Sequence, residues 1–171
     1  NMSIADNGQI ETWDFTTGIT PFCNTYLAPY FKYVKKVYGS NGNAIKYYMN
    51  NGTTIYIFKT NYFNMAEIDI DINGVNKPNV YGKDIFVFYI FPQKQNLYNM
   101  GAGSVAQNVP GAGLYPDGFG YDRNTLKTYT WRGCNRRGDT TASGYRGGYV
   151  GAYCTRMIML DNWKIADDYK W

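Results

Sequence analysis

The chain lacks histidine altogether, although its 171 residues include eighteen tyrosines and nineteen glycines. Without histidine, Ser-His-Asp and Cys-His catalysis are excluded, and the commonest transition-metal ligand is missing. Carboxylate-only chemistry stays open, but we expect a protein that is not an enzyme. No segment reaches the ~18 consecutive apolar residues that a membrane-spanning helix needs. The abundance of Tyr, Gly, Asn and Thr is typical of a single extracellular, β-rich domain with long loops.

Cysteine is scarce, with three residues at Cys23, Cys134 and Cys154. In an exported protein, Cys134 and Cys154 are expected to form a disulfide. Closing that loop of about twenty residues would stabilise the fold by roughly 3 kcal/mol. Cys23 is then left over, and its position on an aromatic helix face predicts a buried free thiol. Three cysteines without a C-x-x-C pair argue against a zinc site.

The net charge of +4 is unevenly distributed along the chain. Residues 1–20 carry three acids and no base, whereas all six arginines fall between Arg123 and Arg156. This local basic segment has two interpretations. It is either a solvated loop surface or the binding site of an anionic partner.

Residues 1–19 are expected to form an irregular lead-in, and residues 20–38 a helix. Thr20 is interpreted as the N-cap, with Pro21 at the first helical position. Apolar side chains then recur every three or four residues, the spacing of one helix face, at Phe22, Tyr26, Tyr30, Tyr33 and Val37. Pro29 should kink this helix or interrupt it.

From residue 44 the hydrophobic period changes to two, which predicts a sheet core over residues 44–91. Strands are expected at 44–49, 53–59, 67–73 and 84–91, and Asn50-Asn51-Gly52 is a hairpin turn signal. Along 67–73 the isoleucines occupy one face and the acidic residues the other. Residues 101–154 are interpreted as a Gly-rich loop region with short strands near 128–131 and 149–152. Residues 155–171 are interpreted as a strand and a tail.

Three segments together carry a family resemblance. They are Asp-Ile-Asn-Gly-x-x-x-Pro-Asn-x-x-Gly-x-Asp-x-Phe-x-Phe over 71–88, Cys-Thr-x-x-Ile over 154–158, and Asp-x-Trp-x-Ile over 161–165. Over roughly residues 20–171 the chain resembles the soluble domain of bacterial type IV pilin-like proteins, including type II secretion pseudopilins. The resemblance implies an α+β fold, with an N-terminal helix packed on an antiparallel β-sheet. It also implies a C-terminal loop region stapled by the Cys134–Cys154 disulfide.

The resemblance further implies a non-enzymatic structural subunit of a type IV pilus or a type II secretion pseudopilus. Its partners would be itself and other pilin-like subunits, joined through an N-terminal helix missing from this sequence. That helix would also anchor it in the inner membrane, so it would belong to the bacterial cell envelope or an extracellular filament. The alternative is a minor pilin or secreted adhesin that recognises glycan or DNA through the Arg/Tyr-rich 115–150 loop. Its candidate ligand-binding residues are Trp131, Arg132, Arg136 and Arg137.

The segment that begins at Asp69 opens like a calcium loop, D-x-D-x-N-G. The EF-hand pattern then fails, because position 12 is Val80 instead of a bidentate glutamate. Another calcium (Ca2+) geometry stays open, with Asp71, Asn73 and Asp84 as ligands. The other interpretation is structural, in which the two aspartates accept backbone N–H bonds that hold a turned loop. A third interpretation makes Asp71 and Asp84 a general acid/base pair.

Overall fold

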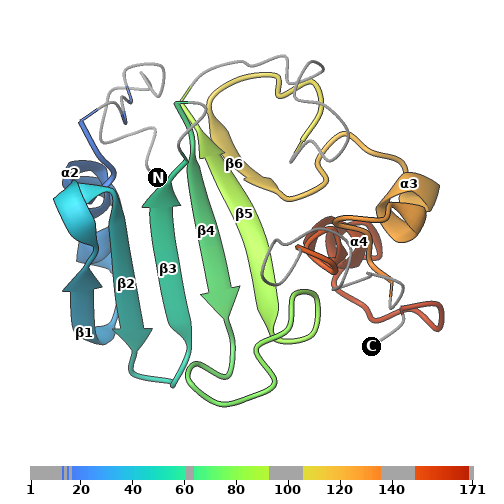
Figure 1. The fold of residues 1–171 in the computed structure, drawn as a ribbon, viewed down its shortest axis with the longest axis horizontal. Coiled ribbons are helices and arrows are strands. Elements are labelled where there is room, and N and C mark those ends of the chain that lie inside the picture. Colours follow the sequence, from blue (N-terminus) through green and yellow to red (C-terminus); the bar gives the residue numbers. More distant parts are fainter. Residues whose placement is uncertain are drawn as a thin grey trace.

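The computed structural model describes residues 13, 15, 17–60, 64–92, 106–135 and 149–169. Their centre is an antiparallel sheet of six strands, in which the spatial order follows the sequence (Figure 1). The strands are β1 (Tyr33–Tyr38), β2 (Ala44–Met49), β3 (Thr54–Lys59), β4 (Ala66–Asp71), β5 (Ile85–Phe91) and β6 (Gly113–Pro116). The predicted α+β class is therefore confirmed, and β2 to β5 fall within one residue or two of the expected strands.

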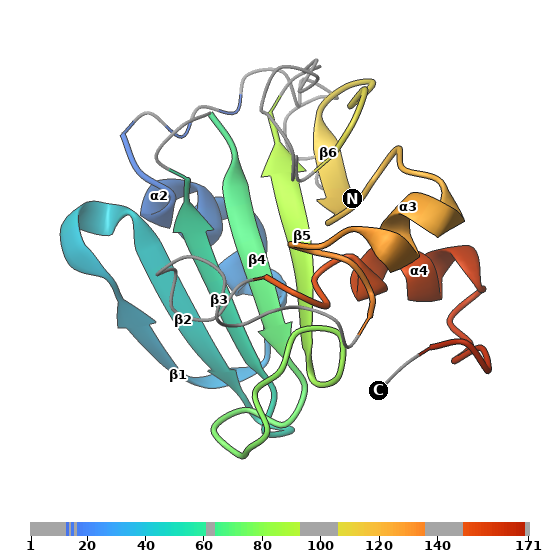
Figure 2. The same cartoon turned by 45° about the vertical axis from the view of Figure 1, so that its right-hand side comes forward.

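One face of the sheet is covered by a continuous helical segment. It comprises α2 (Thr20–Phe22), η2 (Cys23–Leu27) and η3 (Ala28–Tyr30), and it lies behind the strands in Figure 2. Its apolar side packs on the isoleucines that face it, in a core of Trp13, Phe15, Ile19, Phe22, Cys23, Ile45, Tyr47, Ile57, Ala66, Ile68 and Ile90. The free Cys23 thiol is fully buried here, as expected, and burial raises its pKa to about 12.

The predicted helix over 20–38 is wrong in its second half. The helical segment ends at Tyr30, and Tyr33–Tyr38 forms β1, paired antiparallel with β2. Pro29 is the second residue of the last short turn, and it lacks the N–H that an α-helix would bond to the carbonyl four residues earlier. The interval of four residues between Tyr33 and Val37 fits a helix and a strand equally. This segment forms a strand because it pairs with β2. The N-cap is Ile19 instead of Thr20, whose hydroxyl donates to the Gly42 carbonyl.

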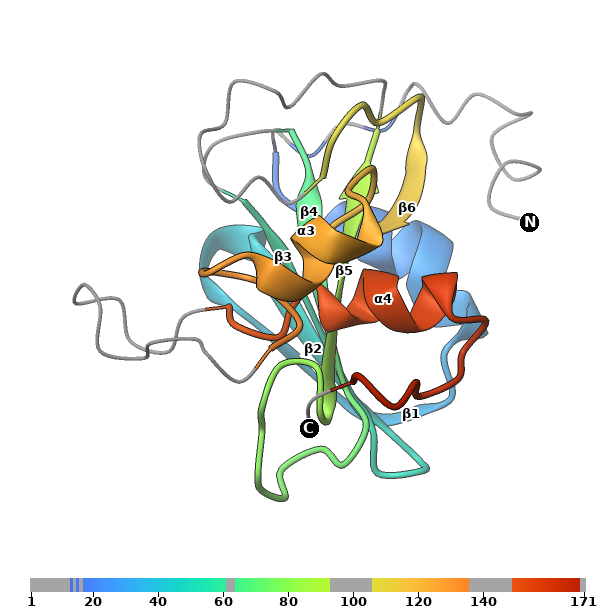
Figure 3. The ribbon, with the colours of Figure 1, turned by 90° about the vertical axis from the view of Figure 1, so that its right-hand side faces the viewer.

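The described residues after β5, 106–135 and 149–169, form what we call the C-terminal layer. It holds β6, α3 (Arg123–Thr128) and α4 (Cys154–Leu160), beside β5 in Figures 1 and 3. The expected loop over 101–154 therefore contains a strand and a helix, and no strand forms at 128–131 or 149–152. The predicted strand at 155–160 is wrong, because its buried residues have helical spacing: Cys154, Thr155, Met157 and Ile158.

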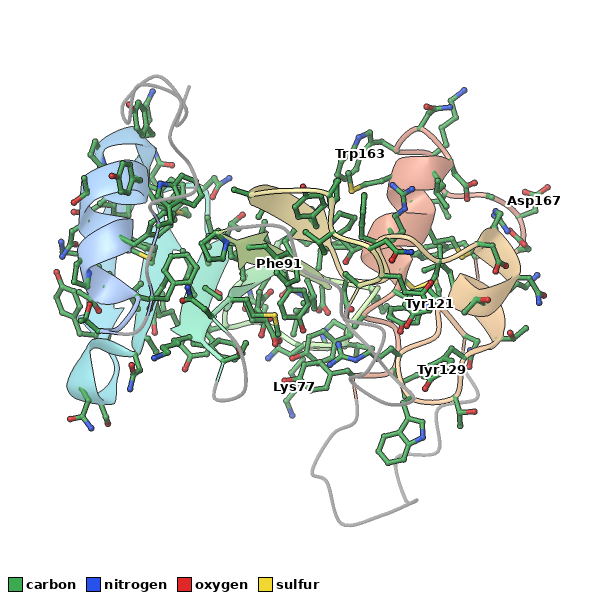
Figure 4. All side chains as sticks on the ribbon, turned by 90° about the horizontal axis from the view of Figure 1, so that it is seen from above. Lys77, Phe91, Tyr121, Tyr129, Trp163 and Asp167 are labelled. Atoms are coloured by element: carbon green, nitrogen blue, oxygen red, sulfur yellow. A yellow bond between two sulfur atoms is a disulfide. The ribbon has the colours of Figure 1, made fainter. Side chains whose placement is uncertain are left out.

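Strand β5 is buried on both faces, which agrees with its near-continuous run of apolar residues. Phe88 and Ile90 meet the helix-side core, while Val87, Tyr89 and Phe91 belong to a second core. The C-terminal layer supplies the rest of that second core, including Ala106, Val109 and Ala152. Figure 4 shows Phe91 in the interior of the molecule and Asp167 at its outer edge.

The Cys134–Cys154 disulfide is present, with a Cα–Cα distance of 4.6 Å. Both cysteines belong to the C-terminal layer, so the bond holds that layer together without tying it to the sheet. Within the described ranges, the helices are all too short or too polar to span a bilayer.

Candidate functional site

The loop between β4 and β5 is organised around the carboxylate of Asp84. Its Oδ2 accepts hydrogen bonds from Asn73 Nδ2 at 2.9 Å and from the Asn79 N–H at 2.8 Å. Its Oδ1 accepts from the Val80 N–H at 2.5 Å. Asp71 Oδ1 accepts from the Asn73 N–H at 3.2 Å, which forms a tight Asx turn. These are the bonds that the structural interpretation expected.

The three candidate calcium ligands therefore lie close together. The hydrogen bonds among them favour a structural role over cation binding. Calcium needs six to eight oxygen ligands. Asn73 instead presents its NH₂ donor to Asp84, and both oxygens of Asp84 are already engaged. Over the described ranges, no three Asp, Glu or Cys side chains are grouped so as to hold a metal. The arrangement favours a structural loop for Asp71, Asn73 and Asp84.

This loop also packs against the C-terminal layer. Gly82 has φ +78°, and a Cβ at this position would lie 2.5 Å from Cys154 Sγ and 2.6 Å from the Gly151 carbonyl oxygen. Only glycine allows so close an approach in a left-handed conformation. From the other side, the Tyr169 hydroxyl donates to the Gly82 carbonyl at 2.5 Å. The loop and the disulfide therefore contact each other directly.

A cluster of acidic side chains lies on the face of the sheet opposite the helical segment. Glu67 is only 3% exposed, and its Oε2 accepts a hydrogen bond from the Tyr89 hydroxyl at 2.8 Å. Asp69 points to the same face, since it is two residues along the strand. Its Oδ2 accepts from the Tyr81 hydroxyl at 3.4 Å. The polar side of β4 at Glu67 and Asp69 is covered by the C-terminal layer.

The C-terminal layer adds one further acid and one base to the cluster. Arg132 Nη1 pairs with Asp117 Oδ2 at 2.5 Å and reaches the Tyr89 hydroxyl at 3.4 Å. The guanidinium also lies over the Tyr149 ring, 4.3 Å from its centroid, and Tyr149 stacks on Tyr81. We call Glu67, Asp69, Tyr89, Asp117 and Arg132 the acidic cluster.

Burial dominates the electrostatics of the acidic cluster. It raises the pKa of Glu67 to about 8 and the pKa values of Asp69 and Asp117 to about 6, because a low-dielectric interior penalises charge. The nearby Asp69 carboxylate raises the pKa of Glu67 further, whereas Tyr89 and Arg132 oppose the rise. Strong shifts of this kind occur in functional sites and in structural networks alike.

The predicted ligand-binding residues do not form one surface in the described residues. The Arg132 side chain is buried in its pair with Asp117, whereas Trp131 is 51% exposed. Arg136 and Arg137 lie outside the described residues. Arg132 therefore fills a structural position and is not an exposed ligand contact.

Sequence reasoning missed Glu67, Asp117 and Tyr89 as members of one site. The alternation along β4 did place Glu67 and Asp69 on the same face. However, nothing in the sequence showed that a segment some fifty residues later would cover that face. The one available signal was the continuous hydrophobicity of β5. A strand of that kind is covered on both faces, so its neighbour β4 should be covered there too.

Comparisons with known proteins give a family but no function. Neither the curated proteins nor the solved structures include a match to this chain. One family model matches residues 1–171, and it describes a family of unknown function, DUF6613. The chain therefore belongs to the DUF6613 family.

Proposed function

We propose that this domain is the head of a pilin-like structural subunit. It would be non-enzymatic and would act by assembly into a type IV pilus or a type II secretion pseudopilus at the bacterial cell envelope. Its partners would be copies of itself and other pilin-like subunits. An apolar helix preceding residue 1 in the full-length protein would join them and anchor the subunit in the inner membrane.

The observation that carries this proposal is the contact between Gly82 and Cys154. The two residues belong to separate motif segments of the resemblance, 71–88 and 154–158, and the fold brings those segments together. The helical segment at 20–30 on one face of an antiparallel sheet agrees with the same architecture. The bonding around Asp84 supports an architectural role for the loop and disfavours the acid/base interpretation.

The native N-terminus tests the proposal. Mass spectrometry of the mature protein from its own cells should find an N-terminus created by prepilin cleavage, followed by about 20 apolar residues, enough to span a bilayer. A mature chain that begins after an ordinary secretory signal, without such a segment, would contradict the proposal.

A binding role for the 115–150 loop is the second candidate. The observation in its favour is Trp131, whose ring is half exposed and offers a stacking surface for a sugar or a base. Fluorescence anisotropy with labelled glycans and oligonucleotides tests it. Affinity that is lost in Trp131→Ala without a change in stability would support it, and no binding by the wild type would contradict it.

A further inference from the structure

The acidic cluster contains more potential negative charge than its one arginine can neutralise. With all carboxyl groups ionised, Glu67, Asp69 and Asp117 would place three negative charges around the guanidinium of Arg132. An uncompensated charge in a protein interior is costly enough that the group binds a proton instead. At least one of the three acids should therefore be protonated in the folded protein.

Hydrogen bonding identifies where that proton belongs. Glu67 Oε1 and Asp69 Oδ1 are both buried, and neither receives a hydrogen bond from the described residues. Glu67 Oε2 already accepts from Tyr89, so Oε1 is its remaining free oxygen. The two side chains share one face of β4, and each shifts the pKa of the other, so a hydrogen bond between them needs a proton on one of the two. A proton on Glu67 supplies the donor that such a bond between two carboxyl groups requires.

The titratable and charged groups around Glu67 come from the neighbouring strands and loop and from the C-terminal layer. These are Tyr56 on β3, Asp69 on β4, Tyr81 in the following loop, Tyr89 on β5, Asp117 after β6, Arg132 after α3 and Tyr149 before α4. Arg132 is the single cation in this set. Loss of the Glu67 proton therefore adds a negative charge that no described side chain neutralises.

We propose that protonated Glu67 is a latch that holds the C-terminal layer on the sheet, and that its deprotonation releases the layer. The cluster is linked to the layer by the polar contact between Tyr89 and Arg132 and by the stacking of Tyr81 on Tyr149. Release would hydrate all three carboxylates. The helix-side core lies on the opposite face and shares none of these groups, so it would stay folded. The disulfide would keep the released layer internally connected.

The direction of the pH dependence follows from the pKa of Glu67. Burial raises this pKa to about 8, against 4.5 for the exposed group. Opening therefore releases one proton at any pH between these values, and each pH unit should raise the opening constant about tenfold. Above about pH 8 the folded state has lost the proton too, so the increase should level off.

Amide hydrogen exchange of the whole domain tests the latch, with rates corrected for intrinsic exchange between pH 6.5 and 8. In the wild type, protection of α4 should fall about tenfold per pH unit near pH 6.5, fall less steeply as the pH approaches 8, and stay below that of β2 at each pH. In Glu67→Gln, which cannot ionise, α4 protection should vary much less with pH and exceed the wild-type value at pH 8. Asp167→Asn, an exposed acid outside the cluster, should retain the wild-type slope.

Two results would overturn the latch. One is an equal pH slope for α4 in the wild type and in Glu67→Gln. The other is identical protection of α4 and β2, which would mean that the layer never opens separately. If Glu67→Gln does not fold, carbon-13 NMR titration of the wild-type Glu67 carboxyl group decides the matter. A midpoint near 8 supports the latch, and a midpoint below 5.5 contradicts it.

Discussion

Tyr89 and Glu67 are direct cross-strand partners on β5 and β4, and the phenol donates a 2.8 Å hydrogen bond to the carboxyl group. This pair lies where two parts of the chain meet. Glu67 belongs to the sheet, whereas the Arg132 that also reaches Tyr89 belongs to the C-terminal layer. A buried hydrogen-bonded network of this kind specifies one arrangement of the two parts, because any other arrangement leaves polar groups unpaired.

The Glu67 carboxyl group should make the domain less stable in mild alkali. Its folded pKa of about 8 lies above the ordinary value of 4.5, so its stabilising contribution is complete below about pH 4.5 and is lost as the pH rises through 8. One proton contributes roughly 1.4 kcal/mol per pH unit in that window. Urea unfolding of the wild type should show this loss, and Glu67→Gln should show much less of it. An equal loss in both proteins would contradict the assignment.

Gly82→Ala should destabilise the domain strongly. The left-handed φ costs a non-glycine residue about 1–2 kcal/mol, and the clash with Cys154 and Gly151 adds roughly 1–3 kcal/mol. Gly52→Ala is the matched control, because φ is +88° there and no atom lies within 4 Å of the new Cβ. Urea unfolding should find a clearly larger loss for Gly82→Ala. Equal losses would show that Gly82 makes no close contact with the disulfide.

Removing the Asp84 carboxylate should destabilise the loop whether or not calcium is present. Asp84→Ala leaves the Asn79 and Val80 N–H groups and the Asn73 amide without their acceptor, at a cost of about 1–3 kcal/mol. Because these donors already occupy both carboxylate oxygens, a chelator should not change the melting temperature of the wild type. A rise in that temperature on adding calcium, absent in Asp84→Ala, would instead revive the cation hypothesis.

Breaking the Arg132–Asp117 pair should destabilise the fold, because it leaves the Asp117 carboxylate buried without its cation. In Arg132→Met the fully buried Asp117 loses the cation with which it pairs, and we expect a loss of about 3–5 kcal/mol. Adding Asp117→Asn removes the unpaired charge and should recover much of that loss. A double-mutant cycle from thermal unfolding measures the coupling. A single Arg132→Met variant as stable as the wild type would contradict a structural role for the Arg132–Asp117 pair.

The strands of the sheet core could be predicted because their period of two and their turn residues agree with the tertiary pairing. Ile45, Ile57 and Ile68 stack across adjacent strands in register, as the alternation required. The segments at 33–38 and 154–160 could not be assigned in this way. Each is a short apolar run that fits a helix or a strand. Residues 33–38 became a strand because they pair with β2, and residues 154–160 became a helix because they cover β5.

The helix α3 had a local signal that the sequence interpretation overlooked. Asp122 caps it by accepting from the Thr125 N–H at 3.0 Å, the side-chain bond typical of an N-cap. The acidic cluster is different in kind, because its members lie on β4, β5 and the C-terminal layer. The sequence could place Glu67 on a face, but only the fold shows that Asp117 and Arg132 cover it.

Filament labelling tests the proposed function most directly. Antibodies raised against this domain, applied to intact and to sectioned cells of the native organism and viewed by immunogold electron microscopy, should decorate surface filaments or a periplasmic pseudopilus. Deleting the apolar helix that we propose to precede residue 1 should abolish the decorated assembly while the domain itself still folds. Cells that release the full-length product only as a free monomer, without any labelled filament, would contradict the account.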